Sequence, residues 1–176
     1  MCLAGPLLLD TIRPLPLTEV GTIHNDPTAP QDVHSQSLVL RSTDRGLIDT
    51  VVAHTGPRAR SLVELRHLSG ALGRPPQIPS AVGHRDGILS LFTIAYPADD
   101  HTAADTAQRR LLADLQPWSN GGALLTFLAG PQVTPADIRA AYHPQDYSRL
   151  TELKTRWDPA NMFRFNKNFT PNPQEA

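Results

Sequence analysis

The sequence predicts an α+β fold, in which helices cover one side of a largely antiparallel sheet and further helices lie at the C-terminus. Short β-rich runs follow one another across loops or single helices, which is typical of such a layer. Most of the 17 prolines among the 176 residues stand in the connections. Proline interrupts helices, so this spacing favours short elements over a helical bundle. The length is that of one domain.

The expected strands share β-rich composition or an alternation of apolar with polar residues. In the third of them, Leu89, Leu91 and Thr93 fall on one face. Gly121 and Gly122 open the fourth. The four strands are expected at residues 35–41, 62–68, 88–96 and 123–128.

The expected helices carry apolar stripes at helical spacing. The third begins at Thr134, which supplies an N-cap, followed by Pro135 at the first helical position and Asp137 in the first turn. Asp158 and Pro159 end the fourth. The first two helices are expected at residues 44–55 and 101–116.

Charge and cysteine content narrow the classes of partner and the compartment. The formal net charge is −1, from 16 basic and 17 acidic residues. No basic stripe is present, which argues against nucleic-acid binding. The apolar run 2–9 is too short to span a membrane and has no charged start, so no membrane contact is expected. The single cysteine favours a reducing compartment, and we expect a cytoplasmic protein.

No motif in the sequence announces an active site. The seven histidines form no i, i+4 pair and have no cysteine partner, so no metal site is predicted. The acids and imidazole of Asp99, Asp100, His101 and Asp105 resemble a ligand set, but a solvated helix start explains them as well. No phosphate-binding glycine loop and no nucleophile elbow is present.

Two local features have both a functional and a plain interpretation. Arg66 and His67 on a strand could present a cation and a titratable ring to a ligand, whereas a salt-bridging strand face is the plain alternative. Tyr142 near a helix end could transfer a proton, whereas core packing is the plain alternative.

The C-terminal part carries a longer signature. Residues 141–150 read Ala-Tyr-His-Pro-Gln-Asp-Tyr-Ser-Arg-Leu, residues 153–154 read Leu-Lys, and residues 157–168 read Trp-Asp-Pro-Ala-Asn-Met-Phe-Arg-Phe-Asn-Lys-Asn. This pattern resembles the C-terminal segment of berberine-bridge-enzyme-like FAD-linked oxidoreductases, of the vanillyl-alcohol-oxidase type superfamily. Residues 64–68 and 121–123 resemble earlier parts of the same family's substrate domain.

The resemblance implies two regions with different roles. Residues 1–130 would form a substrate-domain-like sheet region and residues 131–176 the berberine-bridge-like segment, in one compact unit. An N-terminal FAD-binding domain, which in the family holds the cofactor, is expected to be absent. By resemblance, Arg66 and Thr126 would lie on the substrate side, Tyr142 is the candidate catalytic residue, and Asn166 and Asn168 would contact the flavin.

We therefore expect the substrate-binding part of an FAD-dependent enzyme that oxidises a small alcohol, sugar or amine-like molecule and passes hydride to flavin. It would be inactive without a FAD-binding domain, which a separate chain could supply. The sheet face that covers the flavin in the family would be apolar and exposed, which favours self-association. Leu124 and Thr126 stand where the family often has Tyr and Asn, so a non-catalytic binding module stays open. A truncated gene product without independent activity is a further alternative.

Overall fold

The structure is a computed structural model that describes residues 12–23, 27–96, 100–165 and 167–173. Contacts divide the chain into two units, Met1–Gln31 and Asp32–Ala176. The described part of the first unit contains the 3-10 helix η1 (Leu17–Thr22), in which no residue is buried. The boundary predicted at residues 130 and 131 stays a prediction, and both predicted regions extend into the second unit.

The second unit contains a three-stranded sheet. Its strands are β1 (His34–Leu40), β2 (Leu62–His67) and β3 (Leu89–Ala95), in the order β1-β3-β2. Both pairs are antiparallel, and Leu91 of β3 lies opposite Leu38 of β1 and Leu65 of β2. These strands confirm three of the four expected ones and the antiparallel α+β class.

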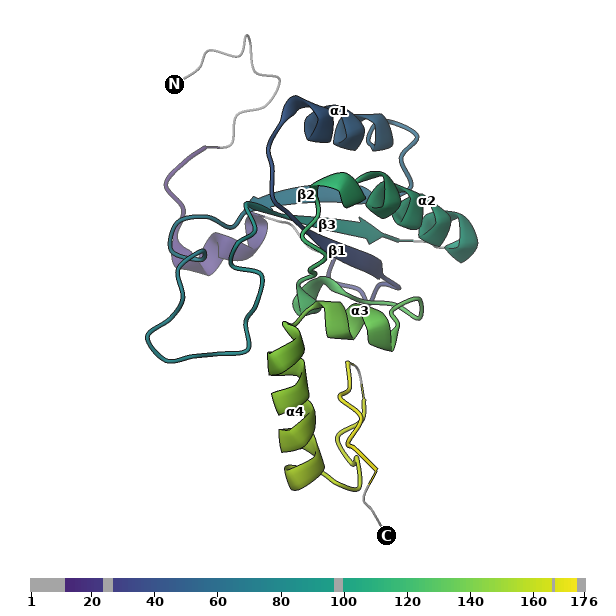
Figure 1. Ribbon diagram of the computed structural model, residues 1–176. Helices are drawn as coiled ribbons and strands as arrows, with labels where there is room; N and C mark the ends of the chain where they lie inside the picture. Colours follow the sequence, from purple (N-terminus) through teal and green to yellow (C-terminus); the bar gives the residue numbers. More distant parts are fainter. Residues whose placement is uncertain (1–11, 24–26, 97–99, 166, 174–176) are drawn as a thin grey trace. The chain divides into compact units, whose positions relative to one another are not determined.

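Helices α1 (Arg45–His54) and α2 (His101–Asp114) lie on the same side of this sheet (Figure 1). The Asp44 side chain caps α1 by accepting the Leu47 N–H at 2.9 Å, because the first turn of a helix has free donors. Each buried leucine of the core contributes about 1.5–3 kcal/mol to folding. The core comprises Leu38, Leu40, Leu47, Val51, Leu91, Leu111 and Leu115.

The prediction of a fourth strand at residues 123–128 is wrong. The chain here forms two isolated bridges with β1, Ser35 with Ala129 and Leu40 with Ser119, and Val39 of β1 also donates to the Gly122 carbonyl. Between residues 119 and 129 the chain forms the 3-10 helix η3 (Leu125–Phe127). The 3-10 helix η2 (Gln116–Trp118) comes directly before Ser119. Just before residues 123–128, Gly122 packs so closely against the His84 ring that no Cβ would fit between them.

The last two helices confirm the predicted C-terminal ones. α3 (Pro135–Ala140) begins with a full capping box between Thr134 and Asp137, and α4 (Pro144–Trp157) buries none of its residues. The final segment runs back beside α4 (Figure 1), where the Asn172 N–H donates to Thr155 Oγ1 at 2.8 Å. In the part of the chain that the structure describes, no helix has the length and apolar character needed to cross a bilayer.

Candidate functional site

The sheet face opposite α1 and α2 carries an aromatic pair and a cation. Phe92 of β3 and Phe127 of η3 lie with ring centroids 4.8 Å apart. The guanidinium carbon of Arg66 lies 4.7 Å from the centroid of the Phe127 ring, which is the geometry of a cation–π contact. The two tilted aromatic rings and the planar cation together form a partly apolar surface.

Arg66 is held in place by its neighbour on β2. Its guanidinium donates to both carboxylate oxygens of Glu64, and this pairing raises the pKa of Arg66. Of the predicted substrate-side residues, Arg66 lies over the Phe127 ring, and Thr126 is the exposed residue before Phe127 in η3.

A second feature is a cleft of about 930 Å³ between the segment around residue 120 and the last two helices. Its lining includes two imidazoles, two phenols and a guanidinium, all of which can bind polar ligands. Arg139 lies over the Tyr147 ring, with its guanidinium carbon 5.1 Å from the centroid. The lining residues used below are His84, Tyr142, His143 and Tyr147.

His84 shapes one wall of this cleft. It is buried, and its φ of 59° is rare for a side chain other than glycine. Its Nε2 lies 2.8 Å from the Ala140 carbonyl oxygen, and a carbonyl can only accept, so Nε2 carries the proton. The His84 N–H donates to His143 Nε2 at 3.3 Å. Burial lowers the pKa of His84, so the ring is neutral at neutral pH.

Tyr142, the predicted catalytic candidate, packs in an aromatic cluster with Tyr147 and Phe169. The centroid of the Tyr142 ring lies 5.3 Å from that of Phe169 and 6.5 Å from that of Tyr147. Burial raises the pKa of the Tyr142 phenol. A phenol of this kind stays protonated at neutral pH, so it suits hydrogen-bond donation better than removal of a proton.

The remaining predicted contacts lie near this cluster in sequence. Asn168 precedes Phe169, and its Oδ1 is buried without a hydrogen-bond partner. Such an acceptor favours a ligand or water that the described residues do not provide. Asn166 lies outside the described residues. No observation tests the flavin contacts predicted for either asparagine.

The structure thus distributes the predicted residues over two places. Arg66 lies on the open sheet face, whereas Tyr142 lines the C-terminal cleft and contacts Phe169, the residue after Asn168. Sequence reasoning missed His84 and His143, because the 59 positions between them hide their contact. The signal that was available was the glycine pair 121–122, which marks a close approach of another chain segment.

Comparison with known proteins shows what the chain is similar to. Residues 123–169 match the family described as "Berberine and berberine like". The FAD-linked oxidoreductase YgaK of Bacillus subtilis is 24% identical over 174 residues, which cover 96% of this chain and 38% of that protein.

Two solved structures share the fold. A carbohydrate oxidase from Microdochium nivale has a TM-score of 0.65 at 17% identity, over 84% of this chain and 34% of its own. The 6-hydroxy-D-nicotine oxidase from Arthrobacter nicotinovorans has a TM-score of 0.63 at 18% identity, over 97% of this chain and 39% of its own. The chain spans little more than a third of the length of these relatives. Residues 123–169 therefore carry the berberine-like segment, and the chain as a whole is similar to the C-terminal portion of berberine-bridge-enzyme-like FAD-linked oxidoreductases.

Proposed function

We propose that this chain forms the substrate-facing part of an FAD-linked oxidoreductase acting on a small alcohol, sugar or amine-like molecule. The observation that carries the proposal is the one-sided cover of the sheet. Helices pack on one face, whereas the other presents Arg66, Phe92 and Phe127. A relative is a carbohydrate oxidase and another a nicotine oxidase, which supports a small, neutral or cationic substrate.

The open face fits the role of a cover over a planar ring. The Phe92–Phe127 pair offers apolar surface, and the cation of Arg66 stacks on it. A bound flavin would supply the acceptor for hydride from the substrate. The residues of this chain would orient the substrate, exclude water and donate hydrogen bonds, with the protonated phenol of Tyr142 among the donors.

A second support comes from exposed apolar side chains at the end of α4 and in the segment after it. Trp157, Phe163 and Phe165 are 74%, 81% and 82% exposed. Exposed apolar groups favour contact with another protein surface. The apolar exposed sheet face predicted from the sequence stays a prediction. We propose that a FAD-binding region, in the same polypeptide or in a separate chain, covers Trp157, Phe163 and Phe165.

Two measurements test this proposal. The 176-residue chain is mixed with excess FAD and desalted, and we expect little flavin absorbance to remain with the protein. Oligosaccharides, alcohols and amines are then added without flavin, and a true substrate should raise the melting temperature by mass action. Arg66→Ala should abolish that rise. Arg45→Ala is the matched control, because Arg45 also pairs with a neighbouring carboxylate, Asp49, but on α1.

The results separate the alternatives. Tight retention of flavin together with turnover of an alcohol by this chain alone would overturn the proposal. If the ligand no longer raises the melting temperature of Arg45→Ala, or still raises that of Arg66→Ala, the sheet face is not the binding site. The DNA upstream of the Met1 codon distinguishes a single longer polypeptide from a two-chain enzyme.

A non-catalytic binding module has one observation in its favour. Leu124 and Thr126 replace residues with longer polar reach, and the Leu124 N–H is used internally, donating to Ser37 Oγ at 3.2 Å. If a ligand stabilises the chain, but flavin-loaded preparations with a FAD-binding region show no reduction of flavin by that ligand, this alternative is correct. A cytoplasmic location stays a prediction.

A further inference from the structure

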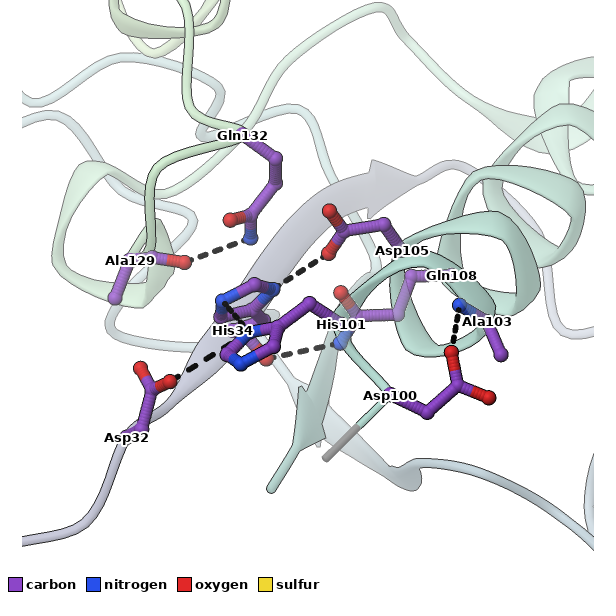
Figure 2. Close-up of polar contacts among 9 residues, drawn as sticks. All are labelled: Asp32, His34, Asp100, His101, Ala103, Asp105, Gln108, Ala129 and Gln132. Atoms are coloured by element: carbon purple, nitrogen blue, oxygen red, sulfur yellow. Dashed lines mark hydrogen bonds and ion pairs between the residues drawn. The ribbon is translucent and has the colours of Figure 1, made fainter. Parts of the chain in front are cut away.

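A cluster of two imidazoles and two carboxylates lies where β1 and α2 begin (Figure 2). His34, the first residue of β1, is 1% exposed. His101, the first residue of α2, faces it with ring centroids 5.1 Å apart. Asp105 lies one turn along α2, and Asp32 precedes β1 by two residues. One ligand atom each from Asp32, His34 and His101 lies within 4.8 Å of the others.

The Asp105 carboxylate fixes the tautomer of His34. Its Oδ1 lies 2.6 Å from His34 Nδ1, and an ionised carboxylate can only accept, so Nδ1 carries the proton. The lone pair of His34 is then on Nε2, which faces His101. Metal-binding histidines are oriented in the same way, by a carboxylate on the ring nitrogen that does not bind the metal. Gln108 also fixes the backbone of His34, since its Nε2 donates to the His34 carbonyl at 2.9 Å.

The distances between the facing atoms suit a metal better than hydrogen bonds. His34 Nε2 and His101 Nδ1 are 3.4 Å apart, and His101 Nδ1 and Asp32 Oδ2 are 3.6 Å apart. Ordinary N–H···O hydrogen bonds span about 2.7–3.2 Å. In a tetrahedral zinc site with bonds of about 2.0–2.1 Å, neighbouring ligand atoms are separated by roughly 3.3–3.4 Å.

The charges also favour a dication. With both imidazoles neutral, Asp32 and Asp105 contribute two negative charges. In the part of the chain that the structure describes, the ion-pair partners of these carboxylates are His101 and His34. The positive end of the α2 dipole opposes a cation, but Asp100 caps that end by accepting the Ala103 N–H at 3.0 Å.

An unpartnered acceptor lies beside the cluster. The Gln132 Nε2 donates to the Ala129 carbonyl at 2.8 Å, and Ala129 bridges to Ser35, the residue after His34. The Gln132 Oε1 is buried without a hydrogen-bond partner. Figure 2 shows the Gln132 amide directing its nitrogen to the Ala129 carbonyl.

We propose that Asp32, His34 and His101 bind a divalent transition metal ion of the zinc type. Asp105 is a positioning residue for His34, and water completes the coordination. Two imidazoles and a carboxylate select zinc-like ions over magnesium and calcium, which prefer oxygen ligands alone. The sequence predicts no metal site because His34 and His101 stand 67 positions apart. Of the acidic cluster considered there, Asp99 lies outside the described residues.

The test is a titration of the metal-free chain with Zn²⁺, followed by calorimetry, with Mg²⁺ as the comparison ion. We expect saturable binding of one Zn²⁺ and no saturable binding of Mg²⁺. Co²⁺ in place of Zn²⁺ should give the visible spectrum of a tetrahedral complex. Asp105→Asn should weaken Zn²⁺ binding by roughly 10–100-fold, as the loss of an orienting carboxylate does elsewhere. His101→Ala, which removes a ligand, should weaken it further.

His54→Ala is the matched control, because His54 Nε2 also pairs with a carboxylate, Asp114, at 2.8 Å. This variant should bind Zn²⁺ as the unchanged chain does. Equal losses in His54→Ala and His101→Ala would show that surface histidines bind the ion non-specifically. Absence of saturable binding would show that the cluster is a chain of polar contacts without a metal. Either result would overturn the proposal.

Discussion

The space beside Gly122 offers a quantitative test of how tightly His84 packs against this segment. A Cβ on Gly122 would come closer than 3.0 Å to Nδ1, Cγ and Cε1 of the His84 ring. The ring cannot swing away freely, because its Nε2 donates to the Ala140 carbonyl and its backbone N–H donates to His143. Gly122→Ala should therefore displace His84 and break the bond to Ala140.

The cost is the sum of two effects. Overpacking costs about 1–3 kcal/mol, and the lost hydrogen bond of a buried ring costs about 0.5–1.5 kcal/mol. Together they give a loss of about 1.5–4.5 kcal/mol in the free energy of unfolding. For a chain of this size, that lowers the melting temperature by about 3–18 °C.

The assay is a double-mutant cycle by urea unfolding, with Gly122→Ala measured alone and in a His84→Gly background. Glycine accepts the φ of 59° at position 84 and removes the ring. In the His84→Gly background, Gly122→Ala should cost close to nothing. The coupling energy between residues 84 and 122 should therefore be at least about 1 kcal/mol. Gly21→Ala, with nothing within 4 Å of its Cβ, is the control. Equal costs of Gly122→Ala in both backgrounds would refute the steric explanation.

Three further outcomes are expected. Because burial lowers the pKa of His84, the unfolded chain binds the proton first as pH falls below about 6.5. The free energy of unfolding should therefore decrease as the pH is lowered through that range. In urea unfolding at several pH values, His84→Asn should show a weaker pH dependence of this free energy. An identical pH dependence would contradict the lowered pKa of His84. Thr134→Ala, which removes the cap of α3, should cost about 0.5–2 kcal/mol in the same assay. A cost below the error of measurement would mean that α3 is held by its packing alone. Phe163→Ser with Phe165→Ser should reduce self-association in analytical ultracentrifugation without lowering the melting temperature, because both rings are exposed. Unchanged association would place the self-contact elsewhere.

Local patterns in the sequence are sufficient to predict most of the elements. The alternation at residues 62–68 and the capping residues Thr134 and Asp137 specify their own neighbourhoods, so β2 and the start of α3 follow from them. The face of the sheet that carries Arg66 also follows, since alternate side chains of a strand lie on the same face.

The close contact of His84 with Gly122 is not predictable in this way, because the two residues stand 38 positions apart in the chain. The partnership of His34 with His101 is hidden for the same reason. Contacts of large sequence separation leave no periodic signal, so both histidine pairs became visible only in three dimensions.

The two histidine pairs lie at opposite ends of the same segment. At one end, the Ser35 N–H donates to the Ala129 carbonyl at 2.8 Å, next to His34; at the other, the Val39 N–H donates to the Gly122 carbonyl at 2.8 Å, next to His84. The residues between these attachments include Thr126 and Phe127, whose ring lies beneath Arg66. Their position therefore depends on both ends being fixed. Hydrogen exchange at residues 123–128 should rise in Gly122→Ala and, if the proposed metal site is correct, on removal of zinc. A rise in only one of the two cases would show that the ends act independently.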